Sequence, residues 1–119
     1  MAASRLRYWL PVLFPMGFIF YMSGQRGQDL PSLFAYQDIV FHLCVYAMLG
    51  WSFGRALSYE KAAPGFFKIV CLCAIFGLLY GISDEYHQSF VSGRTSDIFD
   101  VMTDTAGSFI GGIIVRWLR

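Results

Sequence analysis

The sequence predicts an all-α membrane protein, a compact bundle of four transmembrane helices that forms a single domain over residues 1–119. The chain is 56% hydrophobic and only 14% charged, with a mean hydropathy of +0.52, whereas soluble domains carry about 25% charged residues. Four apolar runs alternate with short polar segments. Each run is near the roughly 20 residues that a helix needs to cross a bilayer, and none shows the period of two that is typical of strands.

The first apolar run covers residues 8–22 and follows Arg5 and Arg7. A basic start and a short apolar core also occur in signal peptides, but no A-x-A-like cleavage site follows and further spans do, so we expect a retained helix. Pro11 and Pro15 should make its early turns irregular, which membrane helices tolerate when neighbours satisfy the freed carbonyls. The polar residues 25–37 are predicted to form a loop.

The second run, residues 39–57, is followed by a polar turn at residues 58–65 and by the third run, residues 66–83. The fourth run covers residues 98–118. Between and within the last two runs, residues 83–104 hold five of the eight acids, one of the two histidines and one arginine. Charge at this density beside lipid-facing sequence is costly unless the protein uses it.

The basic residues indicate the orientation. With four spans both termini share a side, and seven of the nine basic residues fall on that side. The positive-inside rule therefore places both termini in the cytoplasm, with the protein in the cytoplasmic (inner) membrane. The seven are Arg5, Arg7, Arg55, Lys61, Lys68, Arg116 and Arg119. Seven of the eight acids and both histidines fall at the external ends instead.

Pairs of glycines spaced four residues apart occur in three of the runs. They are Gly50 and Gly54, Gly77 and Gly81, and Gly107 and Gly111. Such pairs let helix backbones approach closely in lipid. They serve either packing within one compact bundle or self-association into a homo-oligomer, and the sequence leaves both uses open.

Polar side chains at the external ends of three predicted helices are spaced so that they share helical faces. They are Asp97, Asp100 and Asp104 on the fourth helix, Asp84, His87 and Gln88 on the third, and Asp38 and His42 on the second. Glu85 points to a different face from Asp84 and carries less weight. We expect these groups, together with Arg94 from the intervening loop, to converge on one external pocket.

These residue types fit two kinds of chemistry. Carboxylates and imidazoles at this spacing can bind a divalent cation, for which the candidate ligands are Asp84, His87, Asp100 and Asp104. They can also act as general acids and bases, and the candidate catalytic residues are Asp84, Glu85, His87, Asp100 and Asp104. The planar guanidinium of Arg94 fits a phosphate or carboxylate. The candidate substrate-binding residues are Arg94, Gln88, Asp38 and His42.

Structural roles compete with these functional ones. Asp97 and Asp38 also fit helix N-caps, and Asp100 would favour the dipole of the helix that it begins. Asp84 and Arg94 could form a structural ion pair. Asp104 lies two turns into its run, where an unpaired carboxylate is costly, so a functional role is favoured there.

The spaced motifs resemble those of the VanZ-like family of small bacterial multi-pass membrane proteins. The resemblance rests on Asp84-Glu85-Tyr86-His87-Gln88, Gly93-Arg94, Asp97 or Asp100, Asp104-x-x-Gly107, the pair Asp38 and His42, and the patch from Ser23 to Gln25. Asp104 departs from the pattern, because many relatives have Asn there, and it makes the pocket more acidic. The family takes its name from a member linked to low-level teicoplanin resistance, and an outward-facing polar site suits a role in the cell envelope.

Three functions are compatible with these features. The first is a membrane-embedded enzyme that acts on an envelope lipid or lipid-linked phosphate from the outer leaflet, with an effect on glycopeptide susceptibility. The second is a non-enzymatic envelope protein whose acidic rim binds a cationic compound or a partner. The third is a small transporter or channel subunit. A nucleic-acid partner is not expected at a net charge of +1.

Overall fold

The computed structural model describes the backbone of residues 2–118 and the side chains of residues 4–118. Within that range all regular secondary structure is helical, with no strand, which confirms the predicted all-α class. The elements in order are α1 (Ala2–Trp9), the 3₁₀ helices η1 (Leu10–Val12) and η2 (Gly27–Asp29), with α2 (Leu13–Ser23) between them, then α3 (Gln37–Ser58), α4 (Phe66–Gln88) and α5 (Ile98–Ile114).

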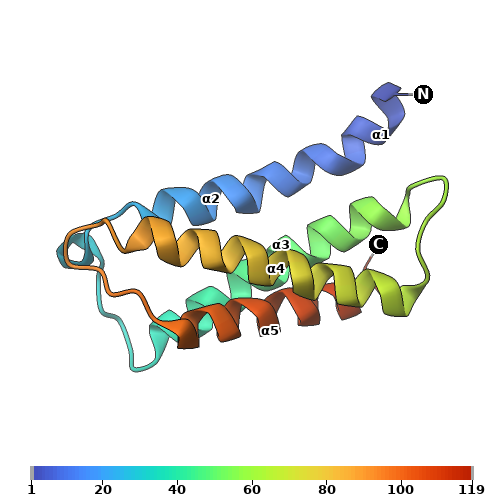
Figure 1. Cartoon of the computed structure of the whole chain (residues 1–119). Coiled ribbons are helices and arrows are strands. Elements are labelled where there is room, and N and C mark those ends of the chain that lie inside the picture. The colour runs from blue at the N-terminus through green and yellow to red at the C-terminus, as the bar shows by residue number, and fades with distance from the viewer. Residues whose placement is uncertain (1, 119) are drawn as a thin grey trace.

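The segments α1, η1 and α2 follow one another without a break and form a single helical rod (Figure 1). The 3₁₀ turn of η1 contains Pro11, which has no N–H to continue the α-helical hydrogen bonding. This confirms the irregular early turns expected from the prolines. The rod begins before the apolar run at residue 8, so its first turns are the more polar residues 2–7.

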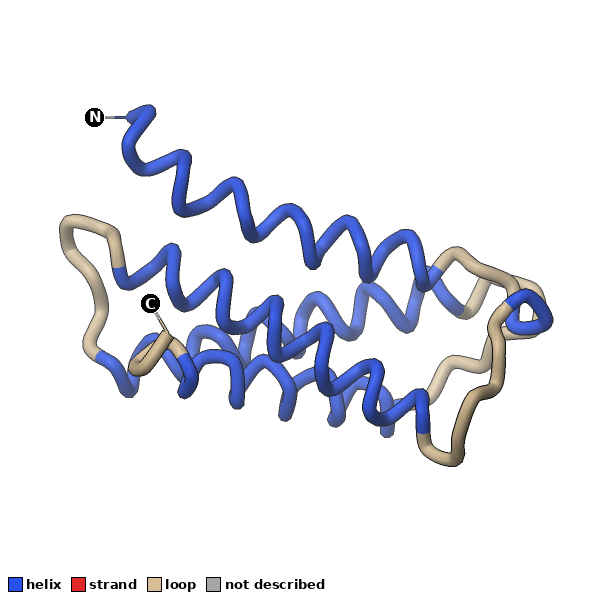
Figure 2. The backbone as a smooth tube through the Cα atoms, turned by 180° about the vertical axis from the view of Figure 1, so that it is seen from behind, coloured by secondary structure: helices blue, strands red, loops and turns tan. Residues whose placement is uncertain are grey.

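The helices α3, α4 and α5 pack side by side, and the rod of α1 and α2 lies along one side of them, diverging toward the N-terminus (Figures 1 and 2). The two termini and the connection from α3 to α4 lie toward one end of the molecule, and the other two connections lie at the opposite end (Figure 1). The fold therefore separates the basic end of the chain from the end that carries the acidic stretch.

The helices differ from the predicted runs mainly at their ends. The helix α4 continues through the polar residues 84–88, whereas the apolar run ends at residue 83. The helix α5 ends at Ile114, and residues 115–117 form turns. Asp97 caps α5, since its Oδ1 accepts a hydrogen bond from the backbone N–H of Phe99 at 3.0 Å. Asp38 does not cap α3, because that helix begins one residue earlier, after Tyr36.

Two helices, α3 and α4, are long and apolar enough to cross a bilayer. Large apolar side chains are also exposed on α2, α3, α4 and α5. Examples are Phe14, Val40, Leu79 and Met102. Such a surface is compatible with a membrane protein. Neither α5, which has 17 residues, nor the helices of the N-terminal rod are both long enough and apolar enough to be counted with α3 and α4. Membrane spans at residues 8–22 and 98–118 therefore stay a prediction.

Close packing of α5 depends on the predicted glycine pairs. A Cβ atom at Gly111 would fall on the carbonyl oxygen of Ala47 in α3, and one at Gly107 would lie 2.6 Å from the carbonyl oxygen of Leu43. A Cβ atom at Gly50 would meet the backbone of Ser108. All six glycines of the three pairs are buried. They serve packing within the chain, the first of the two uses that the sequence allows.

We expect Gly111→Ala to lower the thermal unfolding midpoint of the detergent-purified protein. The added methyl group meets backbone atoms of Ala47 and Trp51, which can move away only if α3 and α5 separate. Overpacking of this kind typically costs about 1–3 kcal/mol. Gly17→Ala is the matched control, because no neighbouring atom lies within 4 Å of a Cβ there. An unfolding midpoint of Gly111→Ala at or above that of Gly17→Ala would contradict this helix contact.

Candidate functional site

Four buried ionisable side chains meet toward the end of the bundle opposite the termini. They are His42 from α3, Asp84 and Glu85 from α4, and Asp104 from α5, and we call them the buried cluster. Each offers one nitrogen or carboxylate oxygen, and these four atoms all lie within 4.8 Å of one another. Asp104 is 0% exposed to solvent and the other three are 5–7% exposed. The cluster therefore lies inside the protein and joins all three core helices.

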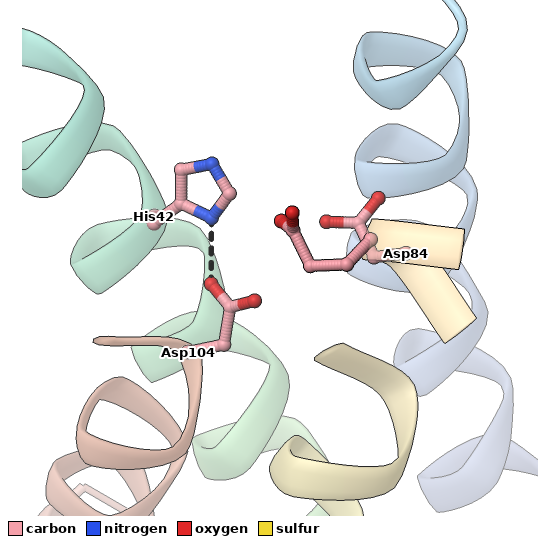
Figure 3. Close-up of side chains that lie close together, drawn as sticks. His42, Asp84 and Asp104 are labelled. Carbon is pink, nitrogen blue, oxygen red and sulfur yellow. Dashed lines mark hydrogen bonds and ion pairs between the residues drawn. The ribbon is translucent and has the colours of Figure 1, made fainter. Parts of the chain in front are cut away.

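The closest contact in the cluster joins His42 and Asp104. The His42 Nδ1 and the Asp104 Oδ1 are 2.6 Å apart, and Figure 3 shows the imidazole facing that carboxylate. When Asp104 is ionised it can only accept, so Nδ1 carries the proton of this bond. Space for Asp104 is provided by Gly81 of α4, where a Cβ atom would lie 2.9 Å from Asp104 Oδ2. A larger residue at position 81 would displace the carboxylate.

Asp84 approaches from the side opposite His42 (Figure 3). Its Oδ2 accepts a hydrogen bond from the hydroxyl of Tyr46 at 3.2 Å. Two carboxylate oxygens are buried without a hydrogen-bond partner among the described residues. They are Oδ1 of Asp84 and Oδ2 of Asp104. Tyr46, which is fully buried, was missed by sequence reasoning because a tyrosine in an apolar run resembles a packing residue.

Glu85 belongs to the buried cluster, which corrects the lower weight assigned to it from helical spacing. Consecutive helical residues point about 100° apart, but both Asp84 and Glu85 are on the inward side of α4. Glu85 Oε2 accepts a hydrogen bond from the backbone N–H of Asp97 at 2.8 Å, and the Ser96 hydroxyl donates to the Glu85 carbonyl at 3.3 Å. The start of α5 thus fixes this carboxylate.

Arg94 binds backbone carbonyls rather than the acids. Its Nη1 donates to the carbonyl oxygens of Met22 at 2.9 Å and Gln25 at 3.0 Å. Hydrogen bonding assigns the side-chain amide of Gln88 with its oxygen toward Arg94, 2.8 Å from Nε and 2.7 Å from Nη2, and its nitrogen 3.3 Å from Glu85 Oε1, because only this orientation pairs donors with acceptors. The alternative of an ion pair between Asp84 and Arg94 is not observed. Gln88 instead connects Arg94 to the cluster.

The other predicted site residues lie outside the cluster. The His87 ring stacks on Phe20 of α2, with ring centroids 4.5 Å apart. Asp100 and Asp38 line a neighbouring cavity. Of the four metal ligands that the sequence suggested, the structure brings Asp84 and Asp104 together and places His87 and Asp100 elsewhere. Their places in the group are taken by His42 and Glu85.

A polar cavity of about 410 Å³ adjoins the cluster at His42. Its lining includes Asp38, Gln88, Arg94 and Asp100, with the loop at residues 30–36 on one side. An apolar groove of about 380 Å³ shares Asp38, His42 and Arg94 with this cavity. The groove continues between α2 and α3, over residues such as Met22, Val40, Phe41 and Cys44. Polar and apolar spaces therefore meet at the imidazole of His42.

A second apolar hollow, of about 940 Å³, lies between α4 and α5. Leu78 and Ile82 of α4 face Met102 and Phe109 of α5 across it, and Glu85 lines it as well. The cluster is thus bordered by apolar space on two sides, at His42 and at Glu85.

The chain matches the protein-family model described as VanZ/LLP1 over residues 8–119, which is essentially its whole length. The matched range includes all four side chains of the buried cluster and Arg94. No curated protein and no solved structure matches the chain.

We expect Arg94→Ala to destabilise the protein much more than Arg26→Ala. Arg94 holds two carbonyls at the end of α2 and the amide of Gln88, and a hydrogen bond to a charged group contributes about 1.5–3 kcal/mol. Arg26 forms an exposed ion pair with Asp29 at 2.9 Å, which contributes about 0–1 kcal/mol. The thermal unfolding midpoints of the two detergent-purified variants, compared with that of the wild type, measure the two losses of stability. Equal losses in the two variants would mean that Arg94 does not anchor this end.

Proposed function

This chain belongs to the VanZ/LLP1 family, and from that premise we propose that it is an integral membrane enzyme acting on an anionic envelope lipid or lipid-linked phosphate. The observation that carries the proposal is the position of the buried cluster, at the junction of a polar cavity and an apolar groove. A site of this shape suits an amphiphile, whose polar head and hydrocarbon chain need different surroundings.

The two spaces fit the two parts of such a ligand. The headgroup would occupy the polar cavity beside His42 and Arg94, and the hydrocarbon chain would follow the groove along Val40 and Cys44. Val40 and Cys44 are exposed on the outer side of α3. In a bilayer a lipid would therefore reach the cavity sideways, between α2 and α3, without leaving the hydrocarbon region.

Arg94 supports an anionic headgroup. Its contacts with Met22, Gln25 and Gln88 use four of its five N–H groups, two at Nη1 and one each at Nε and Nη2, so that one remains for a ligand. The guanidinium is held in place before any ligand binds, and a preorganised charge loses nothing to rearrangement. Its positive charge provides a partner for a phosphate in a cavity whose other charged lining residues, Asp38 and Asp100, are acidic.

The pair of His42 and Asp104 supports acid–base chemistry. The carboxylate holds Nδ1 of the imidazole, which leaves Nε2 to exchange a proton, as in other carboxylate–imidazole pairs. In hydrolysis of a phosphate ester, water attacks phosphorus and the bond from phosphorus to the lipid oxygen breaks. A basic group of the cluster accepts the proton of the water, and the lipid oxygen leaves as an alcohol after it is protonated.

The orientation proposed from the sequence fits this arrangement. The helix α1, the connection from α3 to α4 and the residues after α5 lie toward the end with the termini (Figure 1), and these segments carry the basic residues Arg5, Arg7, Lys61 and Arg116. The connections that flank the cluster lie toward the other end. With the termini in the cytoplasm, the site of a cytoplasmic-membrane protein faces the outer leaflet. An enzyme that consumes a cell-wall precursor there would also alter glycopeptide susceptibility.

Release of phosphate from lipid substrates tests the proposal. We expect the protein, reconstituted in vesicles, to release phosphate from phosphatidic acid or from a polyprenyl phosphate, and His42→Gln to lose about 100-fold or more of the rate, because general acid–base catalysis contributes about 10²–10⁴-fold. Glu60→Gln should keep the rate, since Glu60 contacts Trp9 at the opposite end. No release by the folded wild type, or full activity in His42→Gln, would contradict this function.

The groove makes a separate prediction about chain length. We expect Val40→Trp to lower turnover of a long-chain lipid phosphate several-fold, because the indole fills the groove between α2 and α3. A short-chain, water-soluble analogue should be turned over normally. Leu79→Trp is the control, because Leu79 is exposed on α4 and lies outside the groove. Equal loss for both substrates in Val40→Trp would mean that the groove holds no hydrocarbon chain.

A further inference from the structure

We infer that the four side chains of the buried cluster form a binding site for one divalent cation. The ligands are His42, Asp84, Glu85 and Asp104, a set that joins α3, α4 and α5. The inference deepens the proposed function, because the cation would lie in the same site, but it can be tested without any substrate.

The first argument is charge. Three carboxylates and one imidazole are at most 7% exposed to solvent, and like charges this close cannot all persist without a counter-charge. His42 offsets at most one of the three negative charges. Arg94, the arginine of this end that reaches the cluster through Gln88, donates instead to carbonyl oxygens and to the amide. A divalent cation supplies the missing positive charge in one step.

The second argument is independent of the number of acids. Asp84 Oδ1 and Asp104 Oδ2 are buried and have no hydrogen-bond partner among the described residues. A buried carboxylate oxygen without a partner is costly and needs an explanation. These two atoms belong to residues on different helices, and both residues are in the cluster. An ion bound between α4 and α5 would satisfy both.

The third argument is geometry. Atoms on opposite sides of an ion bound at about 2.1–2.4 Å lie about 4.2–4.8 Å apart, and the four ligand atoms of the cluster lie within 4.8 Å of one another. The close approach of α4 and α5 at Gly81 brings Asp104 to this distance. The ligands therefore need little movement to bind one ion.

Partners that orient the ligands are also present. Tyr46 donates to Oδ2 of Asp84, the backbone N–H of Asp97 donates to Oε2 of Glu85, and His42 contacts Oδ1 of Asp104. Each carboxylate thus has at least one oxygen held by a neighbour, and the second oxygens of Asp84 and Asp104 have no hydrogen-bond partner among the described residues. Such supporting hydrogen bonds are typical of metal sites.

The donor set narrows the identity of the ion. Carboxylates alone suit Mg²⁺, Ca²⁺ and Mn²⁺, and an imidazole suits Zn²⁺ and the later transition metals. Three carboxylates with one imidazole fit Mn²⁺ or Zn²⁺ best. Mn²⁺ is the better probe, because the free ion is detected by electron paramagnetic resonance.

Mn²⁺ titration of the full-length protein in detergent tests the inference. We expect one Mn²⁺ per chain, displaced by Zn²⁺, and at least about tenfold weaker binding in Asp84→Asn and Glu85→Gln, since even supporting residues of metal sites change affinity about 10–100-fold. Asp29→Asn is the matched control, because Asp29 forms an exposed ion pair with Arg26 and lies outside the four ligands. Its affinity should equal that of the wild type.

Two results would overturn the inference. One is a folded wild-type protein that binds neither Mn²⁺ nor Zn²⁺, and the other is binding that Asp84→Asn and Glu85→Gln leave unchanged. Circular dichroism shows whether each variant is folded, and a rise of the wild-type unfolding midpoint with added Mn²⁺ reports binding without any variant. Metal binding without phosphate release would contradict the proposed function alone, and phosphate release by a folded protein that binds neither Mn²⁺ nor Zn²⁺ would contradict this inference alone.

Discussion

Burial of three carboxylates at one point is the constraint on which the rest of this structure depends. Charged groups away from water are strongly unfavourable unless they are paired and hydrogen-bonded. The chain meets this constraint by giving each carboxylate a hydrogen-bonding neighbour from another helix or loop: Tyr46 for Asp84, the N–H of Asp97 for Glu85, and His42 for Asp104. Three helices must therefore end up in one fixed register, because a shift of any of them removes a partner.

That register is set by close helix packing. Ser108 of α5 lies against Gly50 of α3 and Gly77 of α4, and its hydroxyl donates to the carbonyl oxygen of Tyr46 at 3.1 Å. One turn earlier on α5, Asp104 lies against Gly81. The glycines that allow α5 to approach its neighbours thus also bring Asp104 beside His42. Fold and site are consequences of the same small residues, so changes to the glycines should affect both.

The sequence was a good guide to features that lie within one helix. Hydrophobic runs located the helices, Asp97 was one of the candidate helix caps and the structure confirms its cap, and depth in an apolar run identified Asp104. Contacts between helices were predicted less well. Helical spacing shows which residues share a face but not which faces meet, so His87 was grouped with Asp84 although it stacks on Phe20. Glu85 was given less weight because its side chain reaches the cluster from the next face.

The helix α2 shows how such a bundle can hold a charged centre and still leave room for a ligand. It is attached by hydrogen bonds: Ser23 donates to the carbonyl oxygen of Asp84, Arg94 binds that of Met22, and Tyr80 binds that of Met16. These bonds fix the end of α2 beside the cluster, while the apolar groove remains between α2 and α3. Polar contacts between helices are directional and need little contact area. Glycine-mediated packing instead brings two helix backbones so close that little space remains between them. The chain uses close packing where the charges must be held and hydrogen bonds where the proposed lipid must pass.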